Sequence, residues 1–307
     1  MRSKRLKLMV GAVLVAMIGT IFTGCGSDKT SKGENSSSVT ISISGSTSVG
    51  PLMESIQEVY EAKNNNVILE IQQNGSGAGI KDVIGGVSQI GMSSRDLKGE
   101  EKDSVQGTTI AYDGVALLVN PSNLVKNITL EQIKKVYTGE ITNWKELGGE
   151  DGPIVVVSRE EGSGTRDSFQ EIVGYKSEEL VKNASISDGS GSVKTTVAGN
   201  KNAIGFASFE YIDDTVSALN VDGIEPTAKN VKEGNYKISR PFLLVTKKDT
   251  LTQNGQNLID FILSSEGQQI VSDNKPRTSM DARSRDRPPG PRADRRRLLV
   301  TPANGLF

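Results

Sequence analysis

The chain has 307 residues, one cysteine and no histidine, and its formal net charge at neutral pH is −1. Without histidine, a Ser-His-Asp triad, a Cys-His pair and a His-ligated metal site are excluded, and a single cysteine cannot form an intrachain disulfide. Residues 26–275 contain ten more acidic than basic residues, a balance that argues against nucleic-acid binding.

Residues 1–25 have the order of a bacterial export signal: basic residues, then an apolar run over 8–22, then small residues before Cys25. The apolar run is shorter than the roughly 20 residues of a membrane-spanning helix. Cys25 lies where a lipoprotein signal is cut and its new N-terminal cysteine is acylated, so we predict a lipoprotein signal with lipidation at Cys25. A plain membrane anchor and a signal for soluble secretion are the alternatives. The small polar residues of 26–38 predict a flexible tether.

Short β-branched strands alternate with amphipathic helices in the next part of the chain. This alternation predicts an α/β fold with a mainly parallel sheet. The predicted strands are Val39–Ser44, Val67–Gln72, Gln89–Ser93, Ala116–Asn120 and Ile154–Ser158. The predicted helices are Pro51–Lys63, Ala78–Gly85, Thr129–Tyr137 and Thr165–Val173.

Two apolar strands, Gly114–Asn120 and Pro241–Lys247, have the character of crossovers between two lobes. If both are hinges, lobe I is discontinuous and comprises 39–113 plus 237–275, and lobe II comprises 114–236. A ligand would then bind between the lobes, beyond the carboxyl ends of the strands.

Three loops rich in Gly, Ser and Thr each join a predicted strand to a predicted helix: Gly45–Pro51, Asn74–Gly79 and Glu161–Arg166. A helix N-terminus offers unpaired backbone N–H groups and a partial positive charge, which suit an anion. Any one such loop is equally well a helix N-cap. Three in one chain favour an anion site.

Arginine and serine residues lie close to these loops in the sequence. Arg159 precedes Ser163 by four residues and could donate two hydrogen bonds to an oxyanion, or could pair with Glu160 or Glu161. Ser94 and Arg95 end a predicted strand. The glycine spacing does not fit a dinucleotide-binding loop or a P-loop, no metal-like cluster of acidic residues stands out, and nothing offers a nucleophile with a base.

The segment 276–307 differs from the rest of the chain, because it contains eight arginines and no lysine. A basic tail for nucleic acid or a membrane surface is one interpretation. A frameshift or read-through segment, to be left out of fold reasoning, is the interpretation we favour. We expect this tail to be disordered or artefactual.

Several segments together resemble the phosphate-binding proteins of phosphate ABC transporters, of the Gram-positive lipoprotein type. They are SGSTSVGPLMESI, NGSGAGIKDVIGG, IGMSSRDL, AYDGVALLVN, LEQIKKVYTGEITNWKELGG, SREEGSGTRDSF, AIGFASFEY and PFLLVTKK with LIDFILSSEGQQIV. The resemblance covers nearly all of 39–275. The combination of YTGEITNW with R-x-x-x-SGT is its most specific part.

The resemblance implies a type II periplasmic-binding-protein fold whose two lobes, joined by two crossover strands, close on phosphate. It implies phosphate ligands from both lobes: Thr47, Ser48, Ser76, Ser94, Arg159, Ser163, Gly164 and Thr165, with Ser46, Arg95 and Asp113 as less specific candidates. It also implies a monomer without enzymatic activity or cofactor, on the outer face of the cytoplasmic membrane, with permease subunits and a cytoplasmic ATPase as partners.

One position departs from the family pattern. Better-known members have an aspartate where this chain has Ser94, and that carboxylate accepts the proton of phosphate and rejects sulfate. Asp96 and Asp113 are the candidate substitutes. The alternatives are therefore the same fold binding another tetrahedral oxyanion, such as sulfate or molybdate, or a surface adhesin or signalling lipoprotein.

Overall fold

The structure, a computed structural model, describes residues 38–273. The predicted signal, Cys25, nearly all of the predicted tether and the Arg-rich tail lie outside these residues. Ten strands form one sheet in the described part: β1 (Val39–Gly45), β2 (Val67–Gln72), β3 (Ile90–Ser93), β4 (Gln106–Val119), β5 (Asn127–Ile128), β6 (Val155–Arg159), β7 (Ser185–Ser187), β8 (Ala203–Ser208), β9 (Ser217–Val221) and β10 (Ser239–Thr246).

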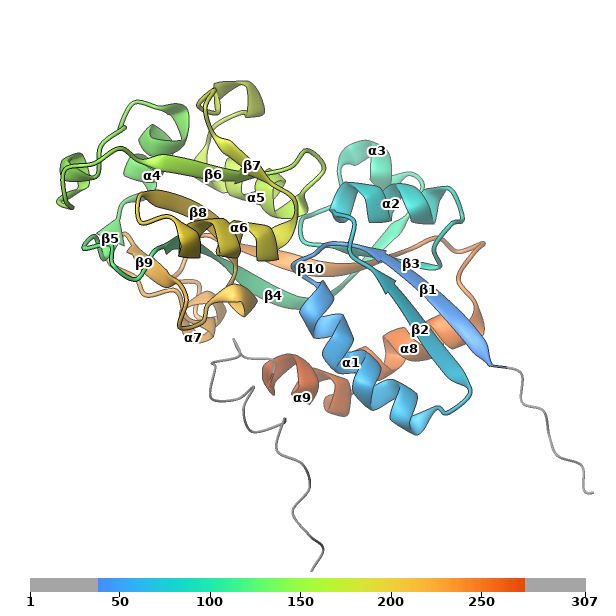
Figure 1. Cartoon of the computed structure of the whole chain (residues 1–307). Helices are drawn as coiled ribbons and strands as arrows, with labels where there is room; N and C mark the ends of the chain where they lie inside the picture. Colours follow the sequence, from blue (N-terminus) through green and yellow to red (C-terminus); the bar gives the residue numbers. More distant parts are fainter. Residues whose placement is uncertain (1–37, 274–307) are drawn as a thin grey trace, which may run out of the picture. The chain divides into compact units, whose positions relative to one another are not determined.

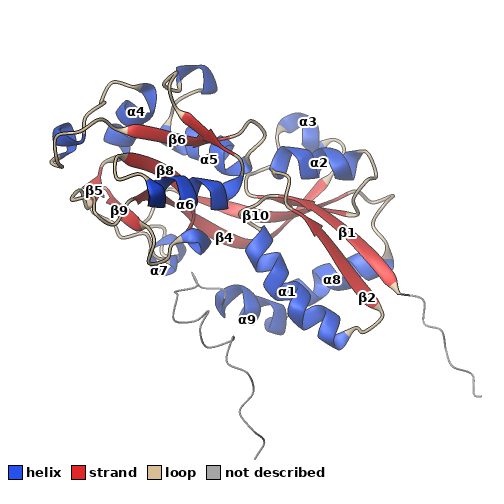
Figure 2. Cartoon of the chain, viewed as in Figure 1, coloured by secondary structure: helices blue, strands red, loops and turns tan. Residues whose placement is uncertain are grey.

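Helices cover the sheet on both sides (Figures 1 and 2). The α-helices are α1 (Gly50–Lys63), α2 (Ser76–Ile84), α3 (Gly99–Lys102), α4 (Leu130–Thr138), α5 (Gly164–Val173), α6 (Gly189–Gly199), α7 (Ala228–Lys232), α8 (Gln253–Leu263) and α9 (Ser265–Asp273). Three 3-10 turns accompany them: η1 (Trp144–Leu147), η2 (Ser177–Glu179) and η3 (Phe209–Tyr211). Within 38–273, no helix combines the length and apolar character that crossing a bilayer requires.

The sheet is mixed rather than mainly parallel, and the strand order along its main path is β2-β1-β3-β10-β4-β8-β6-β7. Pairing is parallel between β1 and its neighbours β2 and β3, and between β6 and its neighbours β7 and β8. In the middle, β4 and β10 are antiparallel to each other and to β8 and β3. The sequence predicted the parallel parts correctly, but the expectation for the whole sheet was wrong because the two central strands run against their neighbours.

Strands β4 and β10 link the two halves of the sheet (Figure 1). Both were predicted as crossovers, but β4 begins eight residues before the predicted Gly114. Its first half is exposed or half-buried except for Ile110, and its second half is a continuous buried run. The exposed half lacks the apolar composition on which the strand prediction rested. The pairing of β4 with β10 shifts register between Phe242 and Leu243, as at a β-bulge.

The buried apolar residues fall into separate clusters. The largest runs from Val115 to Ile238 and lies among the elements between β4 and β10. A second cluster joins Ile41, Val49 and Leu69 of the first helices and strands to Phe242 and other residues of β10 and α8. A third, smaller cluster lies under α2. The chain thus builds two main cores, each covered by its own helices.

Candidate functional site

The loop that follows β1 carries three hydroxyl groups to the start of α1. Ser46 and Ser48 are buried, and Thr47 lies between them. The helix N-cap is Val49, which makes no side-chain cap hydrogen bond, so helix capping does not account for these hydroxyls. Instead, Ser46 Oγ accepts a hydrogen bond from the Ser48 backbone N–H at 3.2 Å, which holds the turn.

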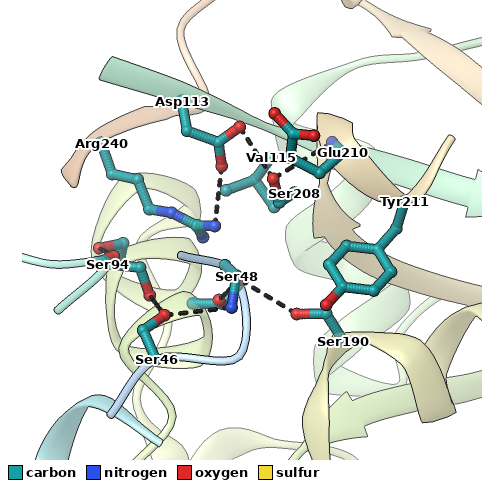
Figure 3. A network of polar contacts seen from close by, with 12 residues as sticks. Ser46, Ser48, Ser94, Asp113, Val115, Ser190, Ser208, Glu210, Tyr211 and Arg240 are labelled. Atoms are coloured by element: carbon teal, nitrogen blue, oxygen red, sulfur yellow. Dashed lines mark hydrogen bonds and ion pairs between the residues drawn. The ribbon is translucent and has the colours of Figure 1, made fainter. Parts of the chain in front are cut away.

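The Ser46 hydroxyl meets hydroxyls from two further loops. It donates to Ser94 Oγ at 2.9 Å (Figure 3), and Ser94 Oγ lies 3.3 Å from Ser76 Oγ. Ser76 is in the first turn of α2 and accepts the backbone N–H of Ser94 at 3.1 Å. The three residues are at most 2% exposed. Loops that are far apart in the sequence therefore bring three of the predicted site residues into one cluster.

Helix α5 adds a further hydroxyl to this cluster. Thr165 Oγ1 lies 2.8 Å from Ser48 Oγ, and both hydroxyls are buried. The loops are also joined by their backbones, since the Gly77 N–H donates to the carbonyl of Gly162 at 2.9 Å. Ser163 is the N-cap of α5 and accepts the Arg166 N–H, so capping does describe this residue.

Gly164 lies at a close approach between these loops. A Cβ atom at this position would collide with the Ser76 hydroxyl and would lie 2.8 Å from Ser76 Cβ and 3.0 Å from Ser94 Oγ. A glycine is therefore needed here for space, and its backbone dihedrals are those of an ordinary helix start. The predicted residues Ser76, Ser94 and Gly164 are thus direct neighbours.

Arg159 ends β6 beneath these hydroxyls and is 1% exposed. Its Nη1 donates to Ser190 Oγ at 3.0 Å and its Nη2 to Thr47 Oγ1 at 3.2 Å. The same guanidinium forms a two-pronged ion pair with Glu160, with distances of 2.7 and 2.6 Å. Of the two interpretations of Arg159 from the sequence, the ion pair with Glu160 is confirmed, whereas donation to an oxyanion stays a prediction. The guanidinium also reaches the hydroxyl cluster.

The Glu160 carboxylate is held in its charged form. Burial alone would raise its pKa, but hydrogen bonds and the charge of Arg159, together with backbone N–H groups, bring the pKa below its usual value. One of those N–H groups is that of Gly189, at 3.2 Å. Glu160 thus fixes the guanidinium plane of Arg159 and ties it to the start of α6.

Sequence reasoning missed two residues of the cluster. Ser190, in the first turn of α6, lies 3.0 Å from Ser48 Oγ (Figure 3) and donates its backbone N–H to Thr47 Oγ1 at 3.2 Å. Tyr211 donates its hydroxyl to the Thr47 carbonyl at 2.7 Å. Ser190 follows a strand, β7, through an Asp-Gly turn, which is the same strand–loop–helix pattern as the other three loops. That pattern could have been found.

Two of the less specific candidates are engaged with charged partners. The Arg95 guanidinium donates to both oxygens of Glu101, at 2.7 and 2.8 Å, and its Nε is 3.0 Å from Asp167 Oδ2. Asp113 pairs with Arg240 on the neighbouring crossover strand: Arg240 Nη2 donates to its Oδ2 at 2.9 Å. The structure therefore gives both residues ion-pair partners, and Ser46, the third such candidate, lies inside the hydroxyl cluster.

Asp113 is 8% exposed, and its environment changes its titration. Burial raises the pKa of the carboxyl to about 6, against the lowering effects of Arg240 and of the hydrogen bond from Ser208. The Ser208 hydroxyl donates to Asp113 Oδ1 at 2.9 Å. Asp113 is therefore a carboxyl whose charge depends on pH in the mildly acidic range.

The site is rich in hydrogen-bond donors and poor in metal ligands. Among residues 38–273, no group of three or more His, Cys, Asp or Glu residues is placed to hold a metal ion. The donors are hydroxyls, backbone N–H groups at the starts of α1, α2, α5 and α6, and the Arg159 guanidinium. Such a set is suited to an oxyanion with several acceptor oxygens.

Comparisons with known proteins identify the family of this chain. A family model described as the PBP superfamily domain matches residues 30–266. The phosphate-binding protein PstS of Bacillus subtilis (strain 168) is 36% identical over 286 residues, which cover 89% of this chain and 93% of that protein. The chain belongs to the PstS family. The predicted family is thereby confirmed.

Solved structures of PstS-type proteins show the same fold. A phosphate ABC transporter substrate-binding protein with bound phosphate, from Clostridium perfringens, is 60% identical, with a TM-score of 0.76, and the match covers 77% of this chain and 98% of that one. An ABC-type phosphate transport receptor from Vibrio cholerae is 36% identical, with a TM-score of 0.65, and the match covers 76% and 98%. The predicted type II periplasmic-binding-protein fold is confirmed, and the PstS family is one of binding proteins rather than enzymes.

Proposed function

We propose that the chain binds inorganic phosphate outside the cytoplasm and delivers it to an ABC importer. The observation that carries this proposal is the meeting of buried hydroxyls from four helix-starting loops around Arg159. The relatives are named as phosphate-binding proteins, and one solved relative contains phosphate. The proposed ligand residues are Thr47, Ser48, Ser76, Ser94, Arg159, Ser163, Gly164 and Thr165, with Ser46 and Ser190 beside them.

Uncharged hydrogen-bond donors would contribute most of the selectivity for phosphate in this site. The Arg159 charge is already compensated by Glu160, and the surrounding chain is acidic overall, so a simple positive field would not attract the anion. Hydroxyl and backbone N–H groups fixed in one arrangement can replace the water around a tetrahedral anion, since their positions are set before binding.

The proposed binding cleft lies between two lobes, 39–113 with 237–275 and 114–236. The separate apolar cores support this division, and the side-chain contacts of Ser48 with Thr165 and Ser190 would join the lobes across the cleft. Strands β4 and β10, which belong to both halves of the sheet, would be the hinges. Closure around the anion would then bring ligands from both lobes together.

The remaining parts of the proposal concern location and partners. The order of residues 1–25 supports a lipoprotein signal cut before Cys25, with acylation at that residue and residues 26–38 as a tether. The protein would then be a monomer on the outer face of the cytoplasmic membrane. Its partners would be the two permease subunits and the cytoplasmic ATPase that the family resemblance implies, and two solved relatives are named as proteins of phosphate ABC transport.

Selectivity among oxyanions depends on which group of the protein accepts a hydrogen bond from a protonated oxygen of the ligand. Ser94 already receives the Ser46 hydroxyl and contacts Ser76, so its own proton could point to the anion. A serine at this position can accept or donate, and it would penalise sulfate less than a carboxylate does. Sulfate is therefore the second candidate ligand.

Calorimetric titration of the protein with phosphate and with sulfate, after removal of copurified anions by unfolding and refolding, tests the proposal. We expect saturable phosphate binding with one site per chain and weaker sulfate binding. The variant Arg159→Gln should lose most of the phosphate affinity, and Lys135→Gln, on the exposed face of α4, should retain it. No phosphate binding by the refolded wild type would overturn the proposed function, and tighter sulfate binding would reassign the ligand.

A further inference from the structure

A second arginine lies next to the proposed site, on crossover strand β10. Arg240 is directly opposite Asp113 of β4 in the register of the two strands, and it is 2% exposed. Its Nη2 donates to Asp113 Oδ2, and the other oxygen of Asp113 accepts the Ser208 hydroxyl. The Asp113 carboxylate thus accepts one hydrogen bond on each oxygen. One of these two bonds fixes the Nη2 edge of the Arg240 guanidinium.

The other edge of that guanidinium has no partner among the described residues. Arg240 Nε and Nη1 are both buried, and neither makes a hydrogen bond within 38–273. The ring of Phe242 lies 5.7 Å from the guanidinium carbon, but an aromatic face does not satisfy N–H groups that lie in the guanidinium plane. A buried charged donor without an acceptor is costly, so a ligand atom at this place would be strongly favoured.

The Arg240 guanidinium lies close to the loop after β1 in the view of Figure 3, which shows it between Asp113 and the loop that carries Ser46 and Ser48. Arg240 is also within electrostatic reach of Arg159: burial lowers the pKa of Arg240 to about 10, and the charge of Arg159 acts in the same direction, against the raising effect of Asp113. Arg159 donates to two of these hydroxyls, and Arg240 is close enough to be affected by its charge.

We propose that Arg240 is a second cationic ligand of the bound oxyanion, donating from Nη1 and Nε while Asp113 fixes its orientation. This inference rests on the proposed function and adds a residue to its site. Arg240 belongs to a hinge strand, so the anion would contact the hinge itself as well as the two lobes.

The charge arrangement supports this role. Each guanidinium has its own carboxylate, Glu160 for Arg159 and Asp113 for Arg240, so the four groups together are neutral. The two positive ends nevertheless repel each other, as the effect of Arg159 on Arg240 shows. An anion with two negative charges placed between them removes that repulsion and satisfies the open donors of Arg240.

The alternative is that Arg240 serves only to neutralise Asp113 within the hinge. A double variant separates the two roles, because removing Arg240 alone would leave Asp113 as an unpaired buried charge. In Arg240→Gln with Asp113→Asn, the pair becomes two neutral amides, and the net charge of the protein does not change. Glu131→Gln with Lys135→Gln, an exposed pair on α4, is the matched control that also removes one charge of each sign.

Calorimetric titration with inorganic phosphate, together with thermal unfolding without phosphate, tests the inference. We expect the double variant to fold cooperatively and to bind phosphate about 10- to 100-fold more weakly than the wild type, the usual range for losing a charged hydrogen-bond donor. The α4 control should bind as the wild type does. A folded double variant with wild-type affinity would overturn the role of Arg240 while leaving the proposed function intact.

If the double variant does not fold, the variant Arg240→Lys provides the same test. It keeps the positive charge next to Asp113 but removes the planar two-edged donor set. We expect weaker phosphate binding at an unfolding midpoint close to that of the wild type. Unchanged affinity in Arg240→Lys would show that its guanidinium donors do not reach the ligand. If the wild type binds no phosphate, the proposed function fails first, and this outcome is distinct from both others.

Discussion

Gly164 sets how closely α5 can approach the two segments that carry Ser76 and Ser94. A methyl group at this position would overlap the Ser76 side chain and press on the Ser94 hydroxyl. The residue begins α5 in an ordinary helical conformation, so alanine would be tolerated by the helix itself. The space requirement therefore comes from the contact between loops and not from the backbone.

We predict that Gly164→Ala weakens phosphate binding at least ten-fold with little change in thermal stability, because the methyl group separates ligand groups that must act together. Calorimetric titration and thermal unfolding measure the two effects. Gly199→Ala, at the end of α6, where a Cβ meets nothing within 4 Å, is the control and should bind as the wild type does. Wild-type affinity in Gly164→Ala would contradict the prediction.

Asp113 gives the stability of the protein a specific pH dependence. Its pKa is about 6 in the folded chain and near 3.8 in an ordinary environment, so the folded state retains a proton that the unfolded state has released. The stabilisation from this proton is complete well below pH 3.8 and is lost as the pH rises through 6. Two pKa units correspond to about 3 kcal/mol.

We therefore predict that the difference in unfolding free energy between the wild type and Asp113→Asn falls by about 3 kcal/mol between pH 3 and pH 7 and is constant above pH 7. Urea unfolding at a series of pH values, in buffers without phosphate, gives this difference. A difference that stays constant across the whole range, or increases with pH, would show that Asp113 does not hold its proton in this way.

At the scale of elements, ion pairs connect the segment after β3 to the first turn of α5. Asp167 Oδ2 lies 3.0 Å from Arg95 Nε and 3.0 Å from Lys98 Nζ. In the proposed lobes, these contacts connect lobe I to lobe II beside the site. They are partly buried, since the Arg95 side chain is 7% exposed and that of Asp167 is 27% exposed.

We expect Asp167→Asn to weaken phosphate binding about five-fold, because it removes about 1 kcal/mol that favours the contact between these elements. The effect should shrink at high ionic strength, since salt screens partly exposed charges. Titrations at low and high salt measure it. Asp151→Asn, in an exposed turn away from α5, is the control and should bind phosphate as the wild type does. If Asp151→Asn lost as much affinity as Asp167→Asn, the change in net charge alone would explain the weaker binding.

At the scale of the whole molecule, two cores connected by two strands predict a change of shape on binding. A bound anion would accept hydrogen bonds from both proposed lobes, in addition to the contacts of Ser48 with Thr165 and Ser190 that already join them. We predict that excess phosphate lowers the radius of gyration measured by small-angle X-ray scattering. Ser48→Ala with Thr165→Val removes hydroxyls from both sides and should show a smaller change. An unchanged radius in the wild type would contradict a hinged cleft.

The sequence predicted the elements with strong local signals. The predicted helix Thr129–Tyr137 matches α4 to within one residue at each end, and local signals hold it there: Thr129 and Gln132 form a capping box, and Gly139 ends the helix in a left-handed conformation. The antiparallel run of β4 and β10 was not found, since strand direction depends on where a distant segment returns. Arg240 was missed for the same reason: nothing near it in the sequence marks its opposition to Asp113.

The arrangement of the two cores also determines the order in which the chain can fold. The core from Val115 to Ile238 is made of one continuous stretch, whereas the other needs Ile41 and its neighbours together with Phe242 and Leu258. β3 cannot complete its pairing until β10 is available. A chain that emerges N-terminus first must therefore leave the pairing of its first strands incomplete while the core from Val115 to Ile238 forms. Export should leave β1–β3 as the last part to become protected from proteases.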